Sequence, residues 1–84
     1  MPPRGFSRYH ALADHLAIRP EHAITCTFAA IEAILGMPLP PSAYTAHSWW
    51  ADPGLAHVRL WREVGWHARL DLRNACVHFT REEE

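Results

Sequence analysis

The stretch that decides the fold runs from Thr25 to Trp50 and has the sequence TCTFAAIEAILGMPLPPSAYTAHSWW. Its first residues alternate between polar and apolar side chains, which is typical of a short half-buried strand. Apolar residues then recur at helical spacing as far as Gly36, a residue type that commonly ends helices. A segment with three prolines must run extended, and it leads into a further helix predicted over 42–50. The stretch therefore predicts two helices joined by a turn.

The residues before this stretch predict one more helix and the body of the strand. Apolar residues recur at helical spacing over Tyr9–Leu16, and Pro20 ends this first helix at about Ile18, because the residue before a proline avoids helical dihedral angles. The alternating segment 23–28 predicts the strand. Thr27 can cap the helix that follows, since its hydroxyl can accept a hydrogen bond from an N–H group of the first turn.

A fourth helix is predicted between Asp52 and Gly65. Asp52 followed by Pro53 is a typical helix start, because a carboxylate caps the first N–H groups and proline suits the first helical position. Apolar residues then recur at helical spacing over Leu55–Val64. Gly65 is placed to end this helix.

The C-terminal segment predicts a β-hairpin, because apolar and polar residues alternate on both sides of Arg73-Asn74. A two-residue turn there pairs Leu72 with Ala75, Leu70 with Val77, and Ala68 with Phe79, which places every apolar side chain on one face. The polar face then carries Asp71 opposite Cys76, Arg69 opposite His78, and His67 opposite Thr80. Arginine is not ideal in a tight two-residue turn, so a longer loop stays open as an alternative.

The order of these elements predicts a small α+β domain. We expect three or four helices and a two- or three-stranded antiparallel sheet that ends in the C-terminal hairpin. Without the fourth helix, the order is that of a winged helix-turn-helix domain, in which helix 42–50 takes the recognition position and Arg73-Asn74 forms the wing tip. The chain is expected to be one domain over 1–84, with a mobile arm at 1–6 and an acidic tail at 82–84.

Composition narrows the class of protein. The chain has 84 residues, 49% of them apolar, and a net charge of −1, so no strong basic field attracts nucleic acid or membrane. No apolar run approaches the length of a membrane span, and the N-terminus has no signal-peptide pattern. We therefore expect a cytoplasmic protein without membrane contact. In that compartment Cys26 and Cys76 should stay reduced.

A set of residues spread along the chain matches the motif pattern of a known family. The residues concerned are Thr27, Phe28, Ile31, Glu32, Leu39, Pro40, Ser42, Ala43, Trp49, Trp50, Ala51, Trp61, Gly65, Trp66, Val77 and Phe79. They resemble a family of small uncharacterised bacterial, archaeal and phage domains with the pattern Thr-Phe-x-x-Ile-Glu, Leu-Pro-x-Ser-Ala, Trp-Trp-Ala-Asn and Gly-Trp. The resemblance spans about Tyr9–Arg81 and implies no established activity. Tyr44 replaces the expected Arg and Asp52 the expected Asn, and both changes make the surface less suited to phosphate.

The winged-helix order favours a non-enzymatic nucleic-acid-binding module, for example a small regulator, with DNA favoured over RNA. Helix 42–50 would lie near the groove, and arginines after it would hold phosphates. The candidate contact residues are Ser42, Tyr44, Thr45, His47, Ser48, Arg59, Arg62, Arg69 and Arg73. The helix offers no Arg, Lys, Asn or Gln, the usual base-contacting residues, so a packing helix with a polar outer face is the alternative. For any single arginine, ordinary solvated charge with Glu63 and Asp71 as local partners is the more frequent outcome.

A protein-interaction module without nucleic-acid binding is the second hypothesis, and the near-neutral charge favours it. Trp49 and Trp50 are adjacent and about 100° apart in helical projection, so both cannot point at the same core centre. We expect Trp49 in the core. Trp50 and Tyr44 are then the candidate anchors for a partner, because exposed aromatic side chains are enriched at interfaces. An exposed Trp50 would also favour a homodimer.

The sequence predicts neither an enzyme nor a metal protein. Cys76 and His78 share one strand face with His67 nearby, but a zinc site typically takes four ligands and Cys26 should face the core instead. Residues two apart on a strand are about 7 Å apart along it, which is too far for a nucleophile and its base without side-chain reach. The sequence shows no glycine-rich phosphate loop, so no cofactor is expected.

Overall fold

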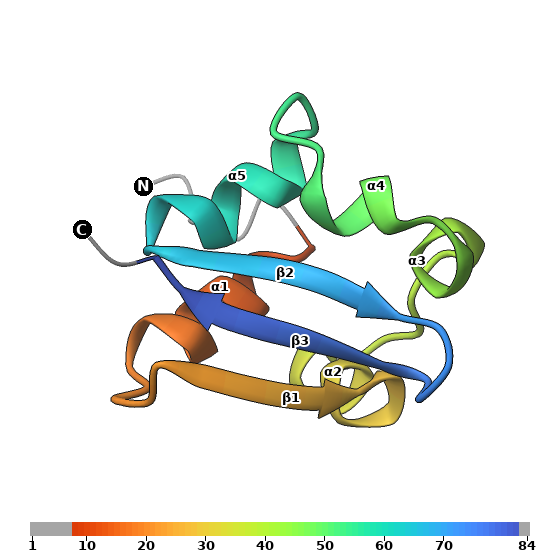
Figure 1. Ribbon diagram of the computed structural model, residues 1–84, viewed down its shortest axis with the longest axis horizontal. Coiled ribbons are helices and arrows are strands. Elements are labelled where there is room, and N and C mark those ends of the chain that lie inside the picture. Colours follow the sequence, from red (N-terminus) through yellow and green to blue (C-terminus); the bar gives the residue numbers. More distant parts are fainter. Residues whose placement is uncertain (1–7, 83–84) are drawn as a thin grey trace.

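The computed structural model describes residues 8–82, so the predicted arm at 1–6 and the last two residues of the acidic tail lie outside the described residues. The chain is an α+β domain with a three-stranded antiparallel sheet that ends in a hairpin, which confirms the predicted fold class (Figure 1). The elements are α1 (His10–Ala17), β1 (Ala23–Thr27), α2 (Phe28–Leu35), α3 (Pro41–Thr45), α4 (His47–Ala51), α5 (Ala56–Glu63), β2 (Trp66–Asp71) and β3 (Cys76–Arg81). Over the described range there are five helices rather than three or four, because one predicted helix is split in two.

The sheet has the strand order β1-β3-β2, with every pair antiparallel. The predicted register of the hairpin is confirmed: Leu70 pairs with Val77 and Ala68 with Phe79. The first strand joins the hairpin as a third member and pairs Cys26 with Val77, so the three-stranded alternative is the correct one. Alternation along the strands sends these apolar side chains to the core and the residues between them to the other face.

The hairpin turn is longer than two residues, and the predicted pairing of Leu72 with Ala75 is wrong. The strands end at Asp71 and Cys76, which leaves four residues in the turn. The Asp71 carboxylate accepts hydrogen bonds from the backbone N–H of Asn74 at 3.1 Å and from its side-chain amide at 2.9 Å. These bonds close the turn before Leu72 can pair, and they leave Leu72 61% exposed.

Helix α2 begins and ends where the sequence predicts. The Thr27 hydroxyl accepts the Ala30 N–H at 3.1 Å and so satisfies one of the unpaired donors of the first turn. Gly36 adopts the left-handed conformation at the other end, with φ of 75°. A side chain at this position would be strained, which explains why the helix stops at a glycine.

The single helix predicted over 42–50 is wrong. The backbone is extended at Ala46, with φ of −114° and ψ of 113°, and this break separates α3 from α4. The break turns Trp50 inward, where its indole N–H donates to the carbonyl of Ala43 at 2.8 Å. Trp61 in turn donates its indole N–H to the Trp50 carbonyl at 3.2 Å. Burial of these two rings therefore overrides the helical preference of the local sequence.

The fourth predicted helix starts later than expected. The side chain of Asp52 accepts the Gly54 N–H at 2.8 Å and so forms a turn instead of capping a helix. Helix α5 begins only at Ala56. The cap signal at Asp52 and Pro53 therefore marks a turn between α4 and α5.

The core lies between the helices and one face of the sheet. Trp50, Trp61, Trp66 and Phe79 are its largest fully buried side chains. No helix crosses the other face in Figure 1. That side of the sheet, which we call the open face, carries the outward residues of the strands: Thr25, His67, Arg69, Asp71, Cys76, His78 and Thr80. None of the helices described is long and apolar enough to cross a membrane.

Candidate functional site

The predicted contact residues of the 42–50 segment divide into two groups. Ser42, Thr45 and Ser48 are exposed on α3 and α4. Tyr44 is half-buried, and its hydroxyl donates to the carboxylate of Glu32 in α2. His47 accepts the backbone N–H of β2 at Leu70, with 3.3 Å between the two nitrogens. Tyr44 and His47 therefore hold α3 and α4 in place.

The bond between Tyr44 and Glu32 also changes the acidity of both groups. Glu32 accepts the Tyr44 hydroxyl and the Leu39 N–H, and these bonds lower the pKa of Glu32. The same bond to Glu32 raises the pKa of Tyr44. Tyr44 thus stays protonated and bound to α2, which reduces its value as an anchor for a partner.

Of the two adjacent tryptophans, Trp49 was expected in the core and packs against it, and the exposure of Trp50 was left open by the sequence. Trp50 is fully buried, whereas Trp49 is half-buried and its ring lies 4.0 Å from the ring of His57. Tyr9 packs edge-on against Trp49, with 5.2 Å between ring centroids. The break at Ala46 turns Trp50 inward, and in this conformation Trp50 offers no surface to a partner.

The four candidate arginines are all exposed: Arg59, Arg62, Arg69 and Arg73. Among residues 8–82, none of the four forms an ion pair with a carboxylate, and Arg59 donates only to the carbonyl of Pro53 at 3.0 Å. Asp71, expected as a local partner, is bonded to Asn74 and His78 instead. Within residues 8–82, none of these four guanidinium groups is neutralised by a carboxylate.

Two other arginines have structural roles. Arg19 forms an ion pair with Glu21 at 3.0 Å. Arg81 donates to the backbone carbonyls of Glu21 and Arg19, and its guanidinium lies 4.8 Å from the centre of the Trp66 ring. The exposed arginines are thus distinct from those that hold β1 and β3 to their neighbours.

The four exposed arginines do not converge on one spot. Arg62 precedes β2 and Arg73 follows it, so the length of a six-residue strand, about 20 Å, separates them. Arg59 and Arg62 lie on α5, whereas Arg69 lies on the open face and Arg73 in the hairpin turn. They therefore lie at separate places along the domain.

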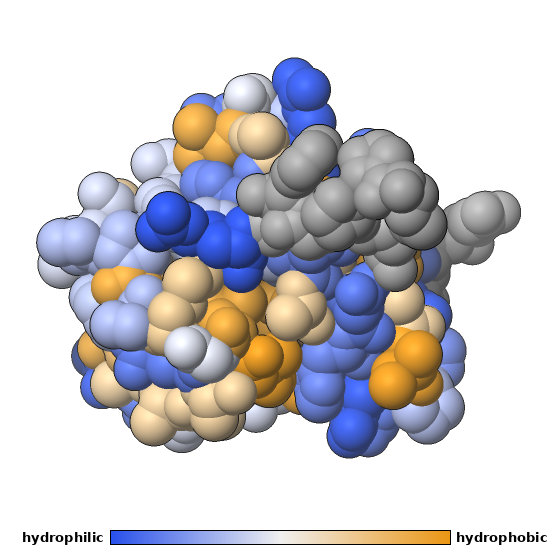
Figure 2. Space-filling view, turned by 180° about the vertical axis from the view of Figure 1, so that it is seen from behind, coloured by the Kyte–Doolittle hydropathy of each residue, from blue (hydrophilic) through white to orange (hydrophobic). Residues whose placement is uncertain are grey.

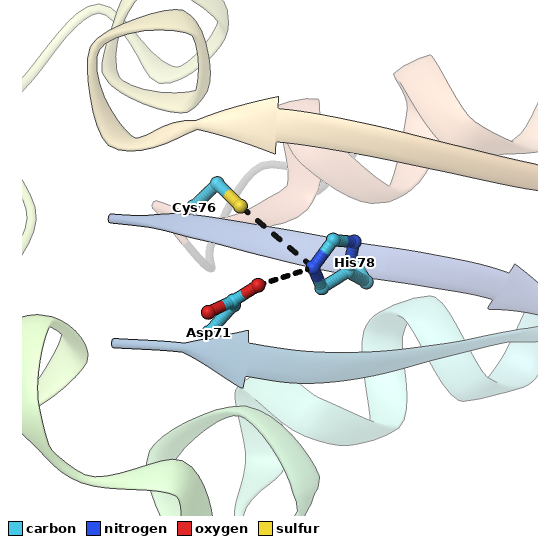
Figure 3. Close-up of side chains that lie close together, drawn as sticks. All are labelled: Asp71, Cys76 and His78. Atoms are coloured by element: carbon cyan, nitrogen blue, oxygen red, sulfur yellow. Dashed lines mark hydrogen bonds and ion pairs between the residues drawn. The ribbon is translucent and has the colours of Figure 1, made fainter. Parts of the chain in front are cut away.

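A cluster of polar side chains lies on the open face, and the sequence predicted only part of it. Asp71, Cys76 and His78 meet there, with Asp71 projecting from β2 and the other two from β3 (Figure 3). The Nε2 atom of His78 lies 2.7 Å from Asp71 Oδ2 and 3.8 Å from Cys76 Sγ. The other ring nitrogen, Nδ1, lies 2.9 Å from the hydroxyl oxygen of Thr25 in β1.

The register explains how the strands assemble this cluster. Cys76 and His78 share one face of β3, as predicted, and Asp71 is the cross-strand partner of Cys76. Thr25 is the cross-strand partner of His78 from the other side. The sequence pattern predicted Asp71 opposite Cys76. It did not predict that Asp71 also contacts His78, its diagonal neighbour on β3. The contact of Thr25 with His78 depends on the pairing of β1 with β3, which the pattern does not specify.

The environment of the cluster keeps Asp71 ionised. Hydrogen bonds from the Asn74 side chain, from His78 and from the Asn74 backbone hold the pKa of Asp71 well below its usual range. Cys76 is buried beneath the open face, and both Cys26 and Cys76 are free thiols. Cys26 faces the core, as expected, and burial raises the pKa of its thiol.

The geometry gives little support to nucleophilic catalysis by Cys76. The Nε2 atom nearest the thiol is already bonded to Asp71, whereas a base that activates a nucleophile uses one nitrogen for each partner. His67, the third residue considered with Cys76 and His78, lies 3.3 Å from Glu82 and is not part of the cluster. The part of the chain that the structure describes shows no pocket.

One family model matches residues 9–82, and it is described as a domain of unknown function, DUF7662. No curated protein sequence and no solved structure gives a significant match.

Proposed function

The chain belongs to the DUF7662 family, and we propose that it is a non-enzymatic nucleic-acid-binding module of winged helix-turn-helix type, with DNA as the favoured partner. The observation that carries this proposal is the set of exposed arginines 59, 62, 69 and 73, which have no carboxylate partner among residues 8–82. The motif pattern of the family and its range over bacteria, archaea and phages stay predictions.

The strand order supports the winged-helix part of the proposal. A short strand between the first two helices pairs with a C-terminal hairpin, as in winged-helix domains. The last helix before the hairpin is α5, so we assign the recognition position to α5 rather than to the broken segment 42–50. This argument is one of fold analogy, and the side chains must carry the function.

The side chains of α5 suit this assignment better than those of the earlier segment. Arg59 and Arg62 are one helical turn apart and both exposed, so they extend from the same side of α5. Arginine binds phosphates and guanine edges through paired N–H donors, which serine and threonine do not offer. Arg69 and Arg73 would then hold phosphates beside the hairpin. A cytoplasmic location is part of the same proposal.

The test is binding of a labelled DNA duplex, and of a labelled single strand, by fluorescence anisotropy over a series of salt concentrations. Four phosphate contacts on duplex DNA predict a slope of about −3.6 for log K against log salt, and each Arg→Ala variant should reduce the slope by about 0.9. Arg19→Ala is the matched control, because Arg19 is paired with Glu21. Absence of binding at low salt would contradict the proposal.

One observation favours the second hypothesis, a protein-interaction module. Seven of the eight residues of α2, FAAIEAIL, are apolar, yet only Ile31 is buried. Ala29, Ala30 and Ala33 are exposed, and Figure 2 shows apolar side chains gathered at this end of the molecule when it is seen from the helix side. A second copy of the chain could cover this apolar surface and form a homodimer. Analytical sedimentation over a range of concentrations tests this, and a chain that stays monomeric at every concentration would exclude the homodimer.

A further inference from the structure

We propose that Asp71, Cys76 and His78 form a binding site for a zinc ion on the open face of the sheet. This site adjoins two of the arginines of the proposed nucleic-acid surface, because Arg69 is the cross-strand partner of His78 and Arg73 lies in the hairpin turn after Asp71. It revises the expectation that the chain has no metal site. The inference rests on the types of the three side chains, their separations and the groups that orient them.

The three side chains supply the ligand atoms that zinc prefers: a thiolate sulfur, an imidazole nitrogen and a carboxylate oxygen. Their ligand atoms all lie within 4.8 Å of one another. A tetrahedral zinc with bonds of about 2.0–2.3 Å holds sulfur and nitrogen about 3.6 Å apart, and nitrogen and oxygen about 3.3 Å apart. The observed 3.8 Å from Cys76 Sγ to His78 Nε2 fits this geometry. The 2.7 Å from Nε2 to Asp71 Oδ2 must widen by about 0.6 Å, which side-chain rotation can supply.

Thr25 orients the imidazole from the other side. Its hydroxyl oxygen lies 2.9 Å from His78 Nδ1 and can either accept a hydrogen bond from Nδ1–H or donate one to a bare Nδ1. Zinc would take the place of the hydrogen that Nε2 donates to Asp71 in the metal-free chain, and with the remaining proton on Nδ1 the Nε2 lone pair points toward Asp71 and Cys76. A second hydrogen bond of this kind is typical of histidines that bind metal, where it fixes the tautomer and the ring orientation.

Asn74 orients the carboxylate in the same way. Its backbone N–H binds Oδ1 of Asp71, and its side-chain amide binds Oδ2. These bonds hold the carboxylate over the turn with one oxygen toward His78. The ligands therefore stand on paired strands of fixed register, with a supporting hydrogen bond on the histidine and on the aspartate.

An ion can reach the site from solvent. The side chains of His78 and Asp71 are 27% and 15% exposed, while Cys76 forms the floor. The open face leaves room for a water molecule as the fourth ligand, the coordination seen where a zinc ion keeps an open position. Three protein ligands predict weaker binding than a closed four-ligand site.

The test uses the untagged full chain, reduced and stripped of metal with a chelator, and titrated with Co²⁺ as a spectroscopic probe. We expect one Co²⁺ per chain with a sulfur-to-cobalt charge-transfer band, and displacement of Co²⁺ by Zn²⁺. Cys76→Ser should abolish the band, and Asp71→Asn or His78→Gln should weaken binding at least tenfold. Thr25→Val should weaken it about tenfold, because Thr25 positions His78 without touching the ion.

Two controls make the result decisive. Cys26→Ala, which removes the core-facing thiol, and His67→Gln, which removes the histidine paired with Glu82, should both keep the band. Circular dichroism establishes that each variant is folded. The proposal is overturned if the reduced, folded chain shows no sulfur-to-cobalt band, or if the band survives in Cys76→Ser.

Discussion

Replacing Trp50 by phenylalanine should destabilise the domain far more than the same change at Trp49. Trp50 is fully buried and its indole N–H bonds to the Ala43 carbonyl at 2.8 Å. Trp49 is half-buried, and none of the hydrogen bonds of residues 8–82 involves its indole N–H. The two positions are adjacent in sequence, so they form a matched pair for testing the break at Ala46.

The structure sets the size of the effect. Phenylalanine lacks about three of the heavy atoms of tryptophan, worth about 2–2.5 kcal/mol at about 0.8 kcal/mol for each buried group. Loss of the hydrogen bond, which leaves the Ala43 carbonyl without this donor, adds about 1 kcal/mol. Trp50→Phe should therefore cost about 3 kcal/mol of unfolding free energy, and Trp49→Phe about 1 kcal/mol or less.

Urea denaturation followed by far-UV circular dichroism measures both values, and thermal unfolding gives an independent check. For a domain of this size, 3 kcal/mol corresponds to a fall in Tm of about 12–24 °C. A greater loss at Trp49 than at Trp50 would refute the reasoning. It would mean that 42–50 forms one continuous helix with Trp49 directed into the core.

Three further predictions concern the two ends of helix α2 and the dependence of stability on pH. Thr27→Ala should cost about 1 kcal/mol, because it leaves the Ala30 N–H without its cap, and the same denaturation assay would show no change if the cap were unimportant. Gly36→Ala should cost about 1–2 kcal/mol, since φ is 75° there, and an unchanged stability would argue against the left-handed conformation. The pKa of Asp71 is lower in the folded chain than in the unfolded chain, so its stabilising effect is present above the unfolded pKa, near 3.9, and disappears as pH falls through the folded value. Asp71→Asn should therefore be less stable than wild type at pH 7, with a difference that shrinks toward acid pH; a difference independent of pH would contradict this.

The hairpin and the second helix were predictable because their signals are local. Alternation with a period of two fixes which side chains face the core, so the register of Leu70 with Val77 follows from the sequence. Thr27 and Gly36 carry their preferences at the helix ends whatever surrounds them.

The break at Ala46 could not be predicted in this way. No proline or glycine lies in the segment 42–50, and its alanines favour a helix. The break follows from packing of Trp50 against Trp61 and from the bond to the Ala43 carbonyl, both of which depend on the rest of the fold.

The candidate sites were predictable only where the signal is local. The polar pattern indicated that Arg69 would lie on the outer face, and the structure places it there. Nothing in the sequence shows that Asp71 binds Asn74 and His78 rather than the nearby arginines. The position of Thr25 beside His78 needs the pairing of strands far apart in the chain.

The most direct test of the proposed function compares the salt dependence of DNA binding by the wild-type chain and by a variant with arginines 59, 62, 69 and 73 all changed to alanine. The account predicts a wild-type slope of about −3.6 and a slope near zero for the folded variant, while Arg19→Ala keeps the wild-type slope. Equal slopes for the wild type and the fourfold variant would contradict the account.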